Sequence, residues 1–169
     1  TIPWILSGDI SQGHIKFANN FITELGLEKS SAKYFPKNTI LVAMYGATVG
    51  QVGVLDIEAT TNQAICGIFP NEKFITNYIY YFFKSQKEYL LSMAIGGAQP
   101  NISQEIIKNL EIPLPPLETQ KQIAATLDKV IKIISENKKL LEKYDLLIKS
   151  RFIEMFGDPV TNPMGWEVK

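Results

Sequence analysis

The feature that most constrains this chain is a stretch of forty residues without glycine or proline, 117–156. It follows Ile112-Pro113-Leu114-Pro115-Pro116, where three prolines in four positions exclude both a helix interior and a central strand. Gly157-Asp158-Pro159 comes directly after the stretch and is a helix stop signal. We therefore expect a first domain over 1–116, one long helix over 117–157 and a linker over 158–169.

The forty-residue stretch carries a seam of residues spaced alternately by four and three. Eight of its ten positions are apolar, all except Asn137 and Arg151. The ten residues are Ile123, Leu127, Val130, Ile134, Asn137, Leu141, Tyr144, Ile148, Arg151 and Met155. A period of 3.5 residues is typical of a helix packed along another helix, and Asn137 is the kind of polar seam residue that fixes register. At 1.5 Å per residue the helix would be about 60 Å long. We therefore expect a coiled coil with a partner helix; the alternative is that the helix packs back against its own domain.

Residues 1–116 hold nine of the eleven glycines and most of the aromatic residues. Apolar runs predict strands over 39–45, 49–55 and 64–69, of which the first two form a hairpin through Gly46-Ala47-Thr48. A helical pattern begins at Thr76, which can serve as its N-cap, and stops at Gly96-Gly97; Ser103 can cap a shorter helix. The fold class predicted is α+β, a mixed α/β globular domain with a Gly-rich twisted sheet, followed by the long helix.

Charge and composition exclude several classes of protein. Lys plus Arg (17) equals Asp plus Glu (17), so the chain lacks global basicity and any contact with DNA must be local. The single Cys66 cannot form an internal disulfide, and no apolar run approaches the ~20 residues that span a bilayer. We expect a cytoplasmic protein that does not enter a membrane.

No set of residues with the spacing of a catalytic or metal site is found. Gly46, Gly50 and Gly53 lack the lysine of a phosphate-binding loop, and His14 is the only imidazole. The acidic residues of the tail have the wrong order for a nuclease. What remains is three polar loops, 30–33, 60–63 and 97–101, whose amides, hydroxyls and lysine can read bases or hold phosphates, although such clusters are also common in turns and caps.

Several short motifs occur in a specific order and spacing. They are Pro3-Trp4-Ile5, Gly46-Ala47-Thr48-Val49-Gly50, Gly97-Ala98-Gln99-Pro100-Asn101 and Ile112-Pro113-Leu114-Pro115-Pro116. In this order the chain resembles the DNA-specificity (S) subunit of Type I restriction-modification systems. One departure from that family is Glu118-Thr119-Gln120, where a Glu-Gln pair is commoner. The resemblance implies a target-recognition domain, a conserved spacer and dimerisation helix, and a tail that is truncated or leads into a following recognition domain.

The resemblance also implies a non-catalytic part of a larger complex. Its partners would be double-stranded DNA, the modification (methyltransferase) subunit, the restriction subunit, and a second recognition domain or a second copy bound through the helix. S-adenosylmethionine, ATP and Mg would belong to the partner subunits, and no cofactor to this chain. The expected DNA-contacting residues are Ser30, Ser31, Lys33, Tyr45, Thr48, Asn62, Gln63, Gln99 and Asn101. The alternative function is a protein–protein adaptor that uses the helix without reading DNA.

Overall fold

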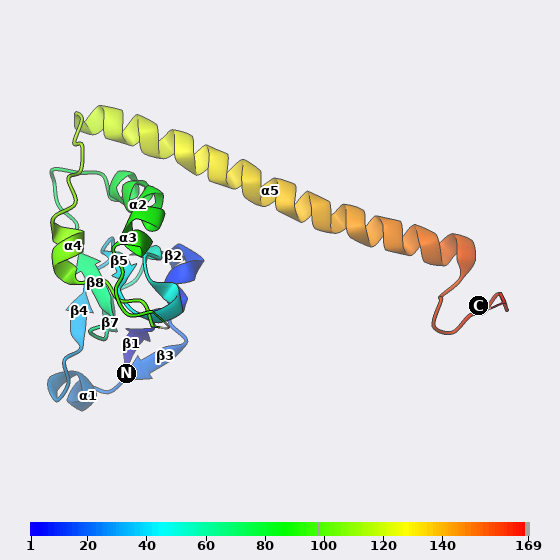
Figure 1. Cartoon of the computed structure of the whole chain (residues 1–169), viewed down its shortest axis with the longest axis horizontal. Coiled ribbons are helices and arrows are strands. Elements are labelled where there is room, and N and C mark those ends of the chain that lie inside the picture. Colours follow the sequence, from blue (N-terminus) through cyan, green and yellow to red (C-terminus); the bar gives the residue numbers. More distant parts are fainter. Residues whose placement is uncertain (98, 168–169) are drawn as a thin grey trace. The chain divides into compact units, whose positions relative to one another are not determined.

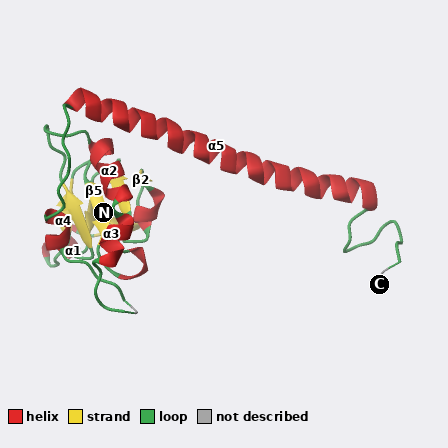
Figure 2. Cartoon of the chain, turned by 45° about the horizontal axis from the view of Figure 1, so that its top comes forward, coloured by secondary structure: helices red, strands yellow, loops and turns green. Residues whose placement is uncertain are grey.

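The computed structural model describes residues 1–97 and 99–167 (Figure 1). The chain divides into two compact units, Thr1–Ala124 and Ala125–Lys169, and helix α5 runs from the first into the second as one unbroken helix (Figure 2). The elements are β1 (Ile2–Ile5), η1 (Asp9–Gln12), β2 (His14–Ile15), β3 (Asn20–Ile22), α1 (Glu24–Glu28), β4 (Lys33–Phe35), β5 (Ile40–Ala43), η2 (Gly46–Thr48), β6 (Val52–Leu55), β7 (Ala59–Thr61), β8 (Ile65–Ile68), α2 (Thr76–Ser85), α3 (Lys87–Ser92), α4 (Gln104–Lys108) and α5 (Leu117–Phe156).

The first unit is built on two four-stranded sheets, with strand orders β3-β1-β7-β4 and β2-β6-β5-β8. Each sheet is mixed, because β1 runs parallel to β7 and β2 runs parallel to β6 while the other neighbours are antiparallel. This arrangement confirms the predicted α+β class.

Strand β5 is buried on both of its faces. Ile40 and Val42 pack with residues of α2, α3 and α4, whereas Leu41 and Ala43 pack with residues of β1, β4 and β7. Successive side chains of a strand point to opposite faces, so this strand contributes to two apolar clusters at once. The sheet β2-β6-β5-β8 is therefore the middle layer, between the other sheet and the helices.

Two glycines allow close approach within these layers. A Cβ atom at Gly67 would lie 2.3 Å from Cε1 of Phe35, so the Phe35 ring occupies the place of a side chain there. A Cβ at Gly53 would lie 3.0 Å from the carbonyl oxygen of Gly13. At these two positions of the predicted Gly-rich sheet, close packing leaves little room for a side chain, which favours glycine.

The predicted elements of the middle layer are present, with changes at their ends. The predicted hairpin is confirmed as β5 and β6, and the third strand as β8. The helix predicted from Thr76 is interrupted at Gln86 and ends at Ser92, before Gly96. The prediction that Thr76 is its N-cap is wrong, because Ile75 holds that position. The N-cap role of Ser103 is confirmed, since its Oγ accepts from Ile106 N at 3.3 Å.

A buried glutamine ties the start of α5 to the start of α2. Gln120 is 1% exposed, and its Oε1 accepts a hydrogen bond from Ile75 N at 2.9 Å. Its Nε2 donates to the carbonyls of Pro115 at 2.8 Å and Lys73 at 3.5 Å. The Tyr78 hydroxyl adds a bond to the Pro113 carbonyl at 2.7 Å. The amide therefore satisfies the backbone of both chain segments that lead into a helix.

Replacing Gln120→Ala is expected to lower the free energy of unfolding of the first unit by about 1–3 kcal/mol, because buried backbone groups lose their partner. Urea denaturation followed by Trp4 fluorescence, in a Trp166→Phe background, measures the change. The exposed neighbour Thr119→Ala is the control and should stay within about 0.5 kcal/mol. Equal effects of the two substitutions would contradict the role of the amide.

Candidate nucleic-acid interface

Two loops open at one end of the middle sheet, and a third segment joins them. Strand β5 ends there at Ala43, and its antiparallel neighbours β6 and β8 begin there. The connections 44–51 and 62–64 therefore lie at the same end. The segment after α3 is attached to the 44–51 connection by a backbone bridge between Asn101 and Tyr45. Asn101 also bridges to Ile95, and Gly46 N donates to the Pro100 carbonyl at 2.8 Å. Ala98 of this segment lies outside the described residues.

The Tyr45–Asn101 bridge joins the two segments that carry four of the predicted DNA-contacting residues: Tyr45, Thr48, Gln99 and Asn101. The Thr48 hydroxyl donates to the Tyr45 carbonyl at 3.2 Å, which closes the turn formed by η2. The side chains of Tyr45, Gln99 and Asn101 are exposed. An aromatic ring and two amides therefore face solvent from one loop cluster.

The other five predicted residues form a second group: Ser30, Ser31, Lys33, Asn62 and Gln63. Ser31 Oγ donates to Gln63 Oε1 at 3.4 Å, and Lys33 is paired with Thr61 across strands β4 and β7. Asn62 and Ser30 instead shape the backbone, since Asn62 Oδ1 accepts from Ala64 N at 3.0 Å and Ser30 Oγ accepts from Ala32 N at 3.2 Å.

One backbone hydrogen bond connects the two groups. Met44 N, next to Tyr45, donates to the carbonyl of Ala64, next to Gln63, at 2.9 Å. The nine predicted residues thus belong to a continuous set of loops, which we call the loop end: residues 30–33, 44–51, 62–64, 95–97 and 99–101. That these residues contact DNA stays a prediction.

Strand β4 also carries a polar pair that the sequence did not indicate. The hydroxyl of the exposed Tyr34 donates a short hydrogen bond to the Glu58 carboxylate. This hydrogen bond, with lesser contributions from desolvation and from the carboxylate charge, raises the pKa of Tyr34 above its ordinary value. Tyr34 and Glu58 are brought together because β4 pairs with β7. The two residues lie 24 positions apart, so no local sequence pattern indicates their contact.

The single histidine contacts an aspartate and a tyrosine, and the single cysteine is buried in the core. His14 Nδ1 is 3.2 Å from Asp56 Oδ1, and its ring lies edge-on to Tyr80 at 5.8 Å. Cys66 is buried in the core, and burial raises the pKa of its thiol. Among the described residues no cluster of three metal-ligating side chains occurs, and none of the helices described is long and apolar enough to cross a membrane.

The predicted seam of α5 is largely exposed in its second half, where Leu141 and Ile148 are 62% and 69% exposed. A further apolar row was missed: Ile133, Leu140 and Leu147 each stand one residue before a seam position and are 44–55% exposed. The sequence signal was present at a spacing of seven residues. The apolar strip of the helix therefore holds three residues per heptad rather than two, which is the pattern of a bundle helix.

Comparison with known proteins identifies relatives that match both parts of the chain. Residues 1–144 match the family model described as Type I restriction modification DNA specificity domain. The chain is 34% identical to the Type I restriction enzyme MjaIX specificity subunit of Methanocaldococcus jannaschii, over 99% of this chain and 43% of that protein. It is 28% identical to the EcoR124I/EcoR124II specificity subunit of Escherichia coli, over 76% of this chain and 33% of that protein. The chain thus spans less than half the length of these relatives.

Two solved structures share the fold. One comes from work on complex assembly and conformational transition of the type I R-M system, with a TM-score of 0.69 and 19% identity over 88% of this chain and 35% of that one. The other is the HsdS subunit of Thermoanaerobacter tengcongensis, with a TM-score of 0.61 and 20% identity over 82% and 32%. Both confirm the architecture of mixed sheets followed by a long helix.

The Tyr34–Glu58 pair makes a pH-dependent prediction. Because the folded pKa of Tyr34 is raised, stabilisation by this bond is present below the unfolded pKa of tyrosine and is lost as the pH rises through the folded one. Glu58→Gln removes the negative charge, so the pKa of Tyr34 should fall toward its ordinary value. Titration of the Tyr34 ¹³Cζ resonance by NMR measures it. Glu28→Gln, an exposed acid on α1, is the control; an unchanged Tyr34 titration in Glu58→Gln would refute the assignment.

Proposed function

Because this chain belongs to the Type I restriction modification DNA specificity domain family, we propose that its first unit binds double-stranded DNA and reads one half of a bipartite site. The observation that supports the proposal is that hydrogen bonds and bridges join the loops that carry the nine predicted residues into one continuous set, the loop end. Loops held by a rigid scaffold are a common place for binding residues.

The exposed side chains of the loop end divide by chemistry. Gln63, Gln99 and Asn101 carry amides, which can pair with the N6 and N7 positions of adenine in the major groove. Lys33 and Ser31 suit phosphate oxygens, which position a protein on DNA without reading sequence. The balanced charge of the chain fits a local interface whose remaining phosphate contacts come from partner subunits.

We propose that α5 pairs with another helix and so fixes the distance between two half-sites. The partner is the corresponding helix of a second recognition domain or of a second copy, and the helix also docks the modification subunits. The three-residue apolar strip supports this, because a pairwise coiled coil needs two rows and the third row, Ile133, Leu140 and Leu147, provides area for further helices.

We propose a division of chemistry in which this chain supplies recognition and no catalytic group. The modification subunit would bind S-adenosylmethionine and transfer the methyl group, and the restriction subunit would use ATP and Mg. The relatives are named specificity subunits of Type I restriction enzymes, which favours this division. The rival function is an adaptor that binds only proteins. It predicts that substitutions in the loop end leave the DNA affinity of the assembled complex unchanged.

A pair of lysine substitutions tests the DNA interface. Lys33→Ala is expected to weaken binding to all duplexes several-fold and to reduce the slope of log affinity against log salt by about one, because one phosphate contact is lost. Lys16→Ala is the matched control, since the exposed Lys16 follows β2 at the end of the middle sheet opposite to the 44–51 connection. Fluorescence anisotropy with random-sequence duplexes, on the chain assembled with its modification subunit, provides the measurement. Equal behaviour of both variants, or no binding at all, would favour the adaptor.

A pair of leucine substitutions tests the helix. Leu141 lies on the predicted seam and Leu146 lies outside it, and the two are 62% and 67% exposed. Leu141→Asp should abolish self-association or assembly with the modification subunit, because a carboxylate would be buried among apolar side chains. Leu146→Asp should leave both unchanged. Mass measurement by light scattering distinguishes the two, and a wild-type chain that remains a monomer, alone and with the modification subunit, would contradict the pairing.

A further inference from the structure

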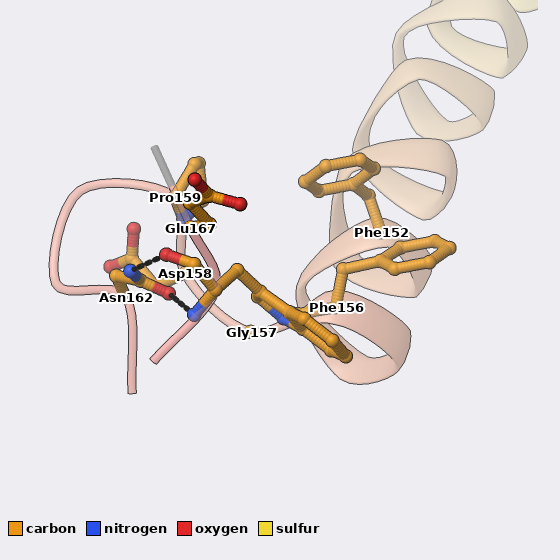
Figure 3. A pocket seen from close by; sticks show the side chains of 8 residues that line it. Phe152, Phe156, Gly157, Asp158, Pro159, Asn162 and Glu167 are labelled. Atoms are coloured by element: carbon orange, nitrogen blue, oxygen red, sulfur yellow. Dashed lines mark hydrogen bonds between the residues drawn. The ribbon is translucent and has the colours of Figure 1, made fainter. Parts of the chain in front are cut away.

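The segment after α5 turns back beside the helix end, and together they line an open pocket, here called the cavity, of about 320 Å³. Its lining includes three aromatic residues, Phe152, Phe156 and Trp166, and two acidic residues, Asp158 and Glu167. Figure 3 shows Glu167 and Pro159 across an open space from the two phenylalanine rings. The two rings lie 5.2 Å apart between centroids, at 40° to each other. Aromatic and acidic residues therefore line the same cavity.

Backbone and side-chain hydrogen bonds hold this cavity in shape. Gly157 adopts φ +78° and its N donates to the Ile153 carbonyl at 2.9 Å, which turns the chain at the helix end. Trp166 Nε1 donates to the Phe156 carbonyl at 2.8 Å. The Asn162 side chain makes two hydrogen bonds to the Trp166 backbone: its Oδ1 accepts from Trp166 N at 2.9 Å, and its Nδ2 donates to the Trp166 carbonyl at 2.8 Å. The indole is thus fixed beside the phenylalanines.

The lining selects the charge of a ligand. A cation gains from the electron-rich faces of aromatic rings and from nearby carboxylates, whereas an anion would be repelled. Within residues 1–97 and 99–167, neither Asp158 nor Glu167 forms an ion pair with a lysine or arginine, and the only arginine of the chain, Arg151, is paired with Glu154 at 2.6 Å. No lysine or arginine among these described residues therefore neutralises the acidic residues of the cavity.

We propose that this cavity receives the guanidinium group of an arginine presented by a partner protein. Guanidinium is favoured over ammonium because its plane stacks on aromatic rings while its edges bond to carboxylates. The proposal does not depend on DNA binding, since the cavity and the loop end lie in different units of the chain.

The probe for this site is Nα-acetyl-arginine amide, titrated into the ¹⁵N-labelled full chain. The Trp166 indole N–H resonance, assigned with Trp166→Phe, should shift in a saturable way. The corresponding citrulline amide is neutral and nearly isosteric, and should bind at least about tenfold more weakly, a difference of about 1.4 kcal/mol. The lysine amide should bind more weakly than the arginine amide.

The double variant Asp158→Asn/Glu167→Gln should weaken arginine binding at least about tenfold. Asn at 158 keeps an oxygen for the bond from Val160 N, so the turn is preserved. Glu142→Gln/Asp145→Asn, which neutralises two exposed acids of α5, should leave binding unchanged. If the double variant alters the Trp166 resonance before any probe is added, Glu167→Gln alone provides the comparison. No saturable shift, equal binding of citrulline, tighter binding of lysine, or full affinity in the neutralised variants would each overturn the proposal.

Discussion

A single buried amide connects the first turn of the long helix to two other segments of the first unit. Gln120 meets the backbone at Ile75, Lys73 and Pro115, so the N-terminal end of α2, the proline segment and the first turns of α5 share one hydrogen-bonding centre. Burying an amide is unfavourable unless its groups are bonded, and here they are. The three prolines keep the preceding segment out of helix and sheet, which lets α5 begin where the amide can reach its partners.

The loop end depends on a different constraint, the burial of β5 on both faces. Leu41 and Ala43 face the other sheet, while Ile40 and Val42 face the helices, so the strand that leads into the 44–51 connection is held from two sides. The Met44–Ala64 and Gly46–Pro100 bonds then attach the neighbouring segments to that connection. Polar residues in turns are thereby presented from a well-packed strand, as the proposed reading of DNA requires.

The sequence was most informative where the signal was local or repeated. The seven-residue period and the flanking Pro and Gly predicted α5, and continuous apolar runs predicted β5, β6 and β8. Strands such as β2 and β7 have two or three residues and depend on distant partners, so no local pattern marks them. The role of Gln120 could not be predicted for the same reason, since its hydrogen-bond partner Ile75 lies 45 positions away in the sequence. The row of Ile133, Leu140 and Leu147 has a regular spacing of seven residues in the sequence. A search for only two apolar residues per heptad does not detect it.

The placement of the two clusters around β5 has an evolutionary consequence. The amides and hydroxyls of the loop end contribute nothing to either apolar cluster, so they can be exchanged singly without opening a void in the interior. Substitution of the exposed Gln63, Gln99 or Asn101 would therefore leave the packing of both clusters intact. If the proposed DNA contacts are made there, an architecture of this kind permits recognition to change by single exposed residues while the interior stays packed.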